Sequence, residues 1–296
     1  MKFRTEITVP ASGLRLAYRD RILMMGSCFV ENLSARLVRA GFAVANNPFG
    51  ILFNPVSIAG GLSDLLDNRV YTPADLFPHR DLFHSFSHHS RFSGTDAHRV
   101  LENLNTHREQ SSAFLRCAGV LIVTFGTARC YRLLSSGEVV ANCHQLPARL
   151  FREERLAVDG ITEQWTALAD RLREQNPRLK ILFTVSPVRH WKDGAHENQL
   201  SKSTLLLAVN ELVNARTSCC FYFPSYEIMM DDLRDYRFYA EDLVHPSTQA
   251  IDYIWEKFCH AHFDQATRAL IDEWEGIQQA LAHRPFHPES EEYQRF

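Results

Sequence analysis

The stretch Arg21-Ile-Leu-Met-Met-Gly-Ser-Cys-Phe-Val-Glu-Asn32 lies near the start of a chain of 296 residues. It opens with an apolar run of strand length that ends at Gly26. From Phe29 onward, apolar residues recur at the spacing of one helix face as far as Ala40. The stretch therefore predicts a buried strand that turns directly into an amphipathic helix, with Ser27 at the turn.

The same alternation of strand-like and helical patterns continues along the chain. Further strand-like runs cover residues 42–45, 119–125, 180–185 and 219–223, and helical periods cover 98–116, 162–175, 201–215, 248–262 and 264–282. Strands that alternate with helices form parallel sheets covered on both faces. We therefore expect a three-layer α/β/α fold with about five mainly parallel strands in flavodoxin-like order. The first strand should be central, with Ser27 just past its carboxyl end.

No repeat, low-complexity tract or linker divides the chain, so residues 1–283 should form one domain and residues 284–296 a loose C-terminal tail. Segments 131–134 and 138–141 flank a Ser-Ser-Gly turn and predict a small hairpin set on the main sheet. Residues 46–97 show the least regular pattern. Long irregular segments of compact folds often form a lid or a site wall.

Composition narrows the class of protein. The chain is 45% hydrophobic, its formal net charge is -3, and its basic residues are scattered, which argues against a nucleic-acid partner. No apolar run is long enough to span a membrane, and residues 1–10 lack the apolar core of a signal peptide. The seven cysteines, an odd number, suit free thiols better than a disulfide framework. These features predict a cytoplasmic protein; the oligomeric state stays open.

Ser27 allows two interpretations. Serine at this position commonly caps the helix that follows. At the carboxyl edge of a parallel sheet, however, a serine hydroxyl also lies beside the free N–H groups of the helix N-terminus, which can stabilise an oxyanion. Residues 21–32 alone favour capping.

A second motif, Asp242-Leu-Val-His245, precedes the helical period at 248–262. An Asp and a His three residues apart can both face the carboxyl edge of the sheet. His245 could then accept the proton of Ser27 while Asp242 orients the imidazole. The pair is a weak signal by itself, but together with a serine at a strand–helix turn it predicts a catalytic triad.

The chain also resembles a known family. Residues 26–32, Gly-Ser-Cys-Phe-Val-Glu-Asn, resemble the motif that names the GSCFA family, with Val30 in place of the usual Ala. The resemblance covers nearly the whole chain, because it continues through residues 47–55, 125–128, 141–144, 184–190, 197–202 and 234–242.

The GSCFA family looks like a branch of the SGNH (GDSL-like) hydrolases. This resemblance implies a five-stranded parallel sheet and esterase-type chemistry that needs no cofactor. By resemblance, Ser27 belongs to the first SGNH block, and Asp242 and His245 belong to the last. The usual first block is Gly-Asp-Ser, whereas here Gly26 directly precedes the serine.

The oxyanion hole is where the sequence departs most from SGNH enzymes. Their third block supplies an asparagine as Gly-x-Asn, but the corresponding residues 126–128 are Gly-Thr-Ala. We expect the side chain of Thr127 or Asn54, or alternatively of Asn47, to replace it. The backbone N–H of Gly50, the best match to the second-block glycine, should complete the hole with the N–H of the serine itself.

Cys28 is an alternative nucleophile, because a helix N-terminus favours a thiolate. The resemblance favours the neighbouring serine. His84, His88 and His89 could begin a metal site, but no carboxylate or cysteine lies at ligand spacing among them. We therefore predict no metal.

Three further residues are candidate substrate contacts. Arg189 and His190 follow the run 180–185, at the strand end where open α/β sheets bind ligands. A structural salt bridge is the alternative for this pair. His144 follows the predicted hairpin, and a neutral core or loop histidine is its alternative.

The sequence as a whole predicts a serine esterase that acts on a small-molecule O-acyl ester, for which an acylated carbohydrate fits the resemblance, or an acyltransferase with the same site. Two alternatives from other classes remain open. One is an SGNH-like fold that binds a ligand without turnover, and the other is a metal-dependent hydrolase built on the 84–89 histidines.

Overall fold

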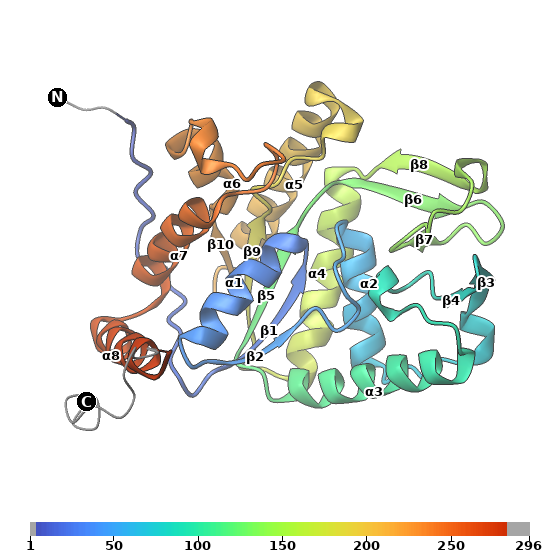
Figure 1. Cartoon of the computed structure of the whole chain (residues 1–296), viewed down its shortest axis with the longest axis horizontal. Helices are drawn as coiled ribbons and strands as arrows, with labels where there is room; N and C mark the ends of the chain where they lie inside the picture. Colours follow the sequence, from blue (N-terminus) through green and yellow to red (C-terminus); the bar gives the residue numbers. More distant parts are fainter. Residues whose placement is uncertain (1–3, 283–296) are drawn as a thin grey trace, which may run out of the picture.

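The computed structural model describes residues 4–282 and has a central sheet of five parallel strands. In the order β10-β9-β5-β1-β2 these are β10 (Cys220–Phe223), β9 (Lys180–Val185), β5 (Val120–Phe125), β1 (Arg21–Gly26) and β2 (Ala43–Asn46) (Figure 1). The predicted parallel sheet in flavodoxin-like order is confirmed. One detail differs: β1 is an interior strand, but β5 holds the middle position.

Helices cover both faces of the sheet. One face carries α2 (Pro55–Leu66), α3 (Ala97–Arg116), α4 (Val158–Gln175) and α5 (Ala195–Ala215). The other carries α1 (Cys28–Arg39), α7 (Thr248–His262) and α8 (Gln265–Ala282). Side chains along β1 alternate between the two cores, with Leu23 in the first and Met24 in the second.

Two small sheets lie outside the main one. β3 (Phe77–His79) and β4 (Leu82–His84) form a hairpin, and β6 (Arg129–Leu133), β7 (Val139–Val140) and β8 (Phe151–Arg155) form an antiparallel sheet. The hairpin predicted at 131–141 is therefore part of a separate sheet with a third strand. Short helical segments complete the chain: η1 (Pro73–Asp75), η2 (Ser90–Phe92), η3 (Ala148–Leu150), η4 (Trp191–Asp193), α6 (Ser225–Glu227), η5 (Ile228–Asp232) and η6 (Tyr236–Phe238).

The region predicted to be irregular, residues 46–97, contains α2. Asn54 caps this helix by accepting a hydrogen bond from the Ser57 N–H at 2.8 Å, and Pro55 occupies its first turn. The two adjacent glycines of α2 weakened the helical pattern in the sequence. Packing against the sheet compensates for their low helix propensity, because Gly61 lies directly against Phe49 and Met25.

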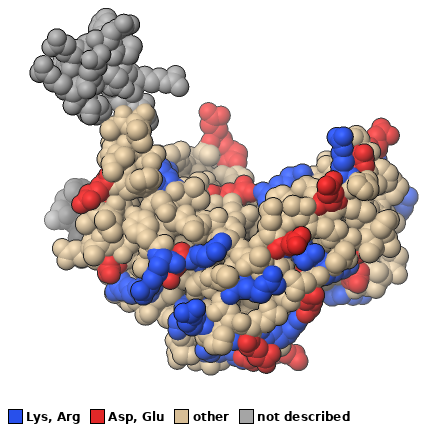
Figure 2. Space-filling model, turned by 90° about the horizontal axis from the view of Figure 1, so that it is seen from below, with Lys and Arg blue, Asp and Glu red and all other residues tan. Residues whose placement is uncertain are grey.

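None of the helices between residues 4 and 282 is long and apolar enough to cross a membrane. The seven cysteines are all unpaired. Acidic and basic side chains are interspersed on the face shown in Figure 2, without a large area of one sign. The tail predicted at 284–296 lies outside the described residues.

Candidate active site

The turn from β1 to α1 is built around Gly26. Its φ of +143° lies outside the usual range of L-residues, and an added Cβ would clash with the backbone carbonyl of Thr124. That same carbonyl accepts a hydrogen bond from the Ser27 N–H at 3.1 Å. Glycine therefore lets β5 approach closely, and this contact fixes the position of Ser27 at the carboxyl end of β1.

Ser27 occupies the N-cap position of α1, but its side chain makes no capping hydrogen bond. The residue is only 1% exposed, and its hydroxyl oxygen has no hydrogen-bond partner within the described residues. The interpretation of Ser27 as a helix cap is therefore wrong, because the hydroxyl is buried and uncommitted.

Asp242 and His245 form the pair that their spacing predicted. Nδ1 of His245 lies 2.6 Å from Oδ2 of Asp242, while Oδ1 accepts the N–H groups of Val244 and His245, each at 2.9 Å. The hydrogen bonds from the backbone and imidazole of His245 lower the pKa of Asp242 to about 2. The carboxylate thus stays charged at neutral pH and orients the ring, leaving Nε2 free.

Ser27 and His245 are not hydrogen-bonded in this structure. The hydroxyl of Ser27 is buried, whereas the side chain of His245 is 48% exposed and pairs with Asp242. The predicted direct bond between Ser27 and His245 is therefore wrong for this conformation, while the predicted Asp242–His245 bond is confirmed.

The backbone donors predicted for the oxyanion hole are already committed. The N–H of Gly50 donates to the carbonyl of Asn47 at 2.8 Å, and the N–H of Ser27 donates to Thr124. Gly50 has a φ of +79°, and an added Cβ would clash with His89. Gly50 is thus needed for a tight turn packed against His89, and its predicted role in the hole is wrong.

The side chains of Thr127 and Asn54 do not reach Ser27 either. The hydroxyl of Thr127 lies 3.0 Å from the Ser201 hydroxyl and accepts the N–H of Arg129 at 3.1 Å. The side-chain oxygen of Asn54 caps α2. Neither makes a hydrogen bond to Ser27, so both predictions for the oxyanion hole are wrong for this structure: Ser201 and Arg129 hold the Thr127 hydroxyl, and the start of α2 holds the Asn54 side chain.

Asn47 makes a direct side-chain contact with the strand–helix turn. It is fully buried, and its Oδ1 accepts the N–H of Gly26 at 2.9 Å. Its Nδ2 has no hydrogen-bond partner within residues 4–282. From the sequence, Asn47 was predicted only as an alternative to Thr127 and Asn54 for the oxyanion hole.

Lys202 is a buried residue for which the sequence predicted no role, although it belongs to the family-like segment 197–202. It is fully buried in α5, and its Nζ donates to the carbonyls of Gly126 at 2.7 Å and Ser186 at 2.8 Å. Burial lowers its pKa to about 7. The helical spacing could have revealed its burial, because Lys202 lies on the same face of α5 as the apolar Leu205 and Val209.

Two cavities flank the segment that follows β9. The larger, of about 610 Å³, is lined by Asp242 and, among others, by residues with aromatic or basic side chains: Arg189, Trp191, Arg234, Tyr236 and Tyr239. The smaller, of about 340 Å³, is lined by Asn54, Thr127, His190 and Lys192 among others. Arg189 and His190 thus line two different cavities at the carboxyl edge of the sheet.

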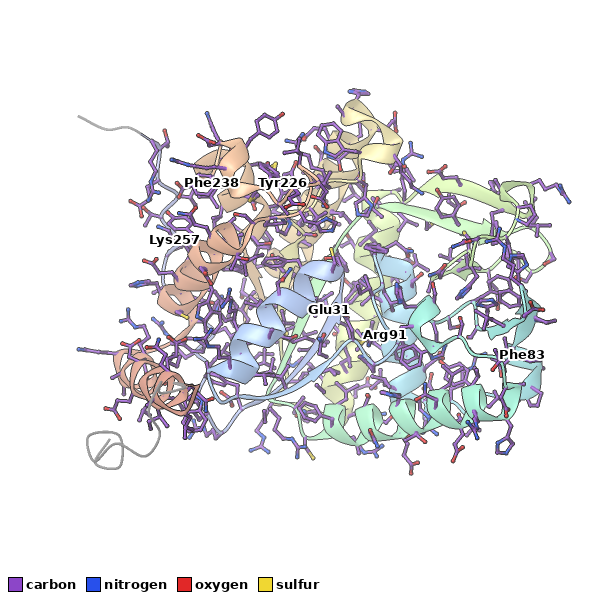
Figure 3. The ribbon with its side chains drawn as sticks, viewed as in Figure 1. Glu31, Phe83, Arg91, Tyr226, Phe238 and Lys257 are labelled. Carbon is purple, nitrogen blue, oxygen red and sulfur yellow. The ribbon has the colours of Figure 1, made fainter. Side chains whose placement is uncertain are left out.

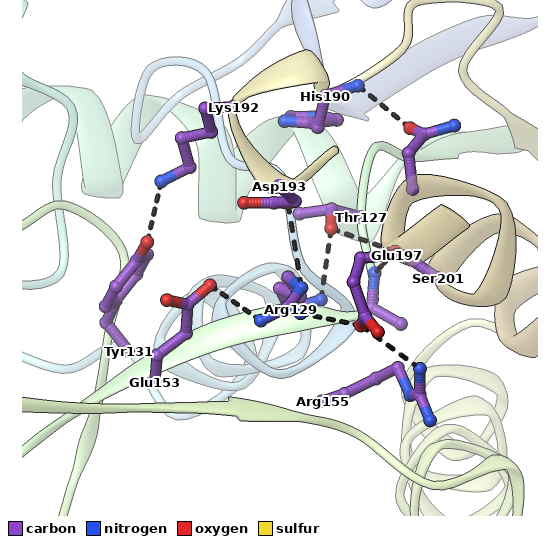
Figure 4. A network of polar contacts seen from close by, with 12 residues as sticks. Thr127, Arg129, Tyr131, Glu153, Arg155, His190, Lys192, Asp193, Glu197 and Ser201 are labelled. Atoms are coloured by element: carbon purple, nitrogen blue, oxygen red, sulfur yellow. Dashed lines mark hydrogen bonds and ion pairs between the residues drawn. The ribbon is translucent and has the colours of Figure 1, made fainter. Parts of the chain in front are cut away.

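A polar network surrounds the smaller cavity (Figure 4). Arg129 is its centre and pairs with Glu153 at 2.8 Å, Glu197 at 2.7 Å and Asp193 at 3.7 Å. Burial, together with nearby positive charge on Lys202, lowers the pKa of His190 to about 4. The ring of His190 is therefore neutral at physiological pH.

His144, predicted as a substrate contact, is a core histidine. It is 5% exposed, its Nε2 lies 2.8 Å from the Ser85 carbonyl oxygen, and its ring packs against His84 at a centroid distance of 4.6 Å. It lines neither of the two cavities. The predicted contact is wrong because β4 and its neighbours enclose the ring.

The histidine side chains at 84–89 make hydrogen bonds to other groups of the protein. His84 contacts the Ser93 hydroxyl at 2.7 Å, and His88 contacts the Ser85 hydroxyl at 3.0 Å. Across residues 4–282, no three His, Cys, Asp or Glu side chains are grouped so that they could hold a metal ion. The metal-dependent alternative therefore lacks a ligand set in this part of the chain.

Burial raises the pKa of the Cys28 thiol, which disfavours the thiolate. The structure therefore argues against Cys28 as the alternative nucleophile.

Comparison with known proteins gives three results. No protein among the curated ones matches the chain. Among solved structures, the chain is similar to a Clostridium thermocellum family 3 carbohydrate esterase, with 12% identity, coverage of 87% of this chain and 98% of that chain, and a TM-score of 0.37. It is also similar to a carbohydrate esterase family 3 protein from Talaromyces cellulolyticus, with 10% identity, 86% and 99% coverage, and a TM-score of 0.38.

Family models give the third result. The GSCFA family model matches residues 21–258, which include the strand–helix turn of Ser27 and the Asp242–His245 pair. A second model, the GSCFA domain protein C-terminal domain, matches residues 274–296. The chain belongs to the GSCFA family.

Proposed function

We propose that the protein is a serine esterase that hydrolyses O-acyl esters, with Ser27 as nucleophile, His245 as general base and Asp242 as its orienting partner. The observation that carries the proposal is the hydrogen-bonded Asp242–His245 pair, which leaves Nε2 of the imidazole free, in a fold where the Ser27 hydroxyl makes no capping hydrogen bond to the helix that follows. This is the division of roles found in serine hydrolases.

The reaction would proceed in two acyl-transfer steps. Nε2 of His245 takes the proton of Ser27 as Oγ attacks the ester carbonyl, and the tetrahedral intermediate collapses when the leaving alkoxide takes that proton back. Water then attacks the carbonyl of acyl-Ser27 and loses a proton to His245. His245 returns this proton to Oγ as the intermediate collapses, which releases the carboxylic acid and regenerates the Ser27 hydroxyl. Asp242 stabilises the imidazolium in both steps.

Turnover requires a conformational change. Ser27 is 1% exposed and has no hydrogen bond to His245, so a substrate path must open and the two side chains must meet. The exposed loop that carries Asp242 and Leu243 is the element suited to this movement, because Leu243 has a φ of +59° and is 55% exposed.

The cavity beside Asp242 supports a substrate class. The side chains of Trp191, Tyr236 and Tyr239 offer flat apolar faces, and Arg189 and Arg234 offer hydrogen-bond donors. This combination suits a small polar ester, and an acylated carbohydrate is the class to test first. The same acyl-serine could pass its acyl group to another hydroxyl, so transfer is distinguished from hydrolysis by adding acceptor sugars.

Covalent labelling tests the proposal directly. A fluorophosphonate should modify the native protein at Ser27, and mass spectrometry of the digested protein should locate the adduct. Ser27→Ala should abolish labelling and lower p-nitrophenyl acetate hydrolysis by several orders of magnitude, with little change in melting temperature. Cys28→Ser is the matched control next to it and should keep both.

Two outcomes would contradict the assignment. Loss of activity in Cys28→Ser with full activity in Ser27→Ala would make the thiol the nucleophile. The burial of Ser27 also favours a second candidate function, ligand binding without turnover. A native protein that neither labels nor hydrolyses any ester tested, but binds acylated sugars, would support that function instead.

A further inference from the structure

We propose that Nδ2 of Asn47 is the side-chain donor that stabilises the oxyanion formed on attack by Ser27. The inference rests on the proposed function and assigns a catalytic residue in place of the donor that Thr127 and Asn54 do not provide. A hole of this kind requires a donor fixed in place before the reaction, with its N–H directed at the developing charge.

The orientation of the Asn47 amide is determined by its contact with Gly26. Oδ1 accepts the N–H of Gly26 at 2.9 Å, and the reverse orientation would set two donors against each other. Nδ2 therefore carries two N–H groups, and neither has an acceptor although Asn47 is fully buried. A buried donor without an acceptor is costly, and a ligand oxygen that arrives during the reaction explains why it is kept.

The contact with Gly26 places this donor beside the residue that precedes the reacting serine. From amide bond lengths, Nδ2 lies at most roughly 5 Å from the Gly26 nitrogen to which Oδ1 is bound. Gly26 directly precedes Ser27, whose hydroxyl is also buried and unpartnered. Two uncommitted polar groups thus flank the same strand end. Asn198 also has a buried Nδ2 without a partner in the described residues. Its Oδ1, however, accepts the N–H of His190, which lies after β9 and not at the end of β1.

Three hydrogen bonds hold the Asn47 backbone in place, and one of them runs from its own N–H to the Met24 carbonyl at 2.9 Å. Its φ of +43° lies in the left-handed region that asparagine tolerates. Its carbonyl accepts hydrogen bonds from the Gly50 N–H and from Arg91, and Arg91 pairs with Glu31 of α1 at 3.1 Å (Figure 3). The loop after β2 is therefore fastened to the helix that Ser27 begins. Such anchoring lets an oxyanion donor act without reorganisation.

Two substitutions of Asn47 separate its acceptor from its donor. Asn47→Asp keeps an oxygen for the Gly26 N–H but removes the Nδ2 donor, and Asn47→Gly suits the positive φ while removing both. Each should lower kcat for p-nitrophenyl acetate by about 10²–10³ with KM changed by less than about threefold. Affinity for a short alkylboronic acid, which forms a tetrahedral adduct with serine, should fall by a similar factor.

Asn176→Asp is the matched control, because its Nδ2 donates to the Ala118 carbonyl near the opposite, amino end of β5. It should lose stability without a change in kcat. If both Asn47 variants are unstable, a crystal structure of the native protein labelled with diethyl p-nitrophenyl phosphate decides, with Nδ2 expected about 3 Å from the phosphoryl oxygen.

The outcomes separate this inference from the function on which it rests. Native protein that labels at Ser27, together with Asn47→Asp that retains wild-type kcat and boronate affinity, overturns the oxyanion assignment alone. An adduct whose phosphoryl oxygen is bound only by backbone N–H groups does the same. Native protein that never labels overturns the proposed function, and the assignment with it.

Discussion

Single residues show most clearly which parts of the site sequence reasoning can reach. Ser27 was identifiable because a strand pattern, a glycine and a helix pattern meet there, and Asp242 and His245 because their spacing is local. Thr127 was misassigned because its partner, Ser201, is set by tertiary packing, and Gly50 was misassigned because a tight turn already uses its N–H for the Asn47 carbonyl. A motif indicates which residues gather at a sheet edge, but not which of their donors remain free.

The charge of Asp242 gives a prediction at this scale. Asp242→Asn should lower kcat by a factor on the order of 10³–10⁴, since the amide no longer stabilises the imidazolium. The pKa of Asp242 is about 2, below its unfolded value, so the stabilisation it gives is present above that unfolded value and is lost only as the pH falls through about 2. The kcat–pH profile of the native protein should therefore show no acid limb from this carboxylate.

Asp96→Asn is the control for Asp242→Asn. Asp96 also accepts two backbone N–H groups, but it does so at the start of α3, away from the candidate site. This variant should keep kcat across the pH range. Equal effects of the two substitutions would show that kcat reports general stability and not the orientation of His245.

At the scale of elements, a helix or strand was predicted correctly where its own residues carry the pattern that forms it. β9 was predicted to the residue, because its aliphatic, aromatic and β-branched side chains are bounded by the turn-forming pairs Asn176-Pro177 and Ser186-Pro187. α2 was missed because its two glycines hide its period, and the start of α5 was missed because its first turn is polar. β8, a strand with the sequence Phe-Arg-Glu-Glu-Arg, forms only because β6 lies beside it.

The strand–helix turn gives the prediction for this scale. Gly26→Ala should destabilise the protein by at least about 2 kcal/mol, because a Cβ strains the positive φ and meets the Thr124 carbonyl. Urea unfolding measures the change in the free energy of unfolding. Gly60→Ala is the control, since this helical glycine has open space around it and the change should be neutral or stabilising by up to about 1 kcal/mol.

Over the whole molecule, Lys202 connects the layers at the edge where the candidate site lies. Its Nζ, on α5, binds carbonyls that follow β5 and β9, and Gly126, one of these two residues, lies against Ser27. Within residues 4–282 the hydrogen bonds of Lys202 go to carbonyls, and no carboxylate pairs with it. Two backbone carbonyls and the face of the Tyr226 ring, whose centroid lies 5.4 Å from Nζ, thus hold this buried amine, and its charge should affect the stability of the entire fold.

Lys202→Met should therefore change how the free energy of unfolding depends on pH. The pKa of Lys202 is about 7 in the folded protein and about 10.4 in the unfolded chain, so between these values the unfolded state binds more protons. Native stability should then rise with pH relative to the variant, with a limiting slope of about 1.4 kcal/mol per pH unit. Urea unfolding of both proteins at intervals from pH 6 to 10 measures the difference, and a Cys28→Ser background removes the nearest titrating thiol. A difference that stays flat from pH 7 to 10 would show that Lys202 remains charged in the folded state, because the two carbonyls would then offset the cost of burial.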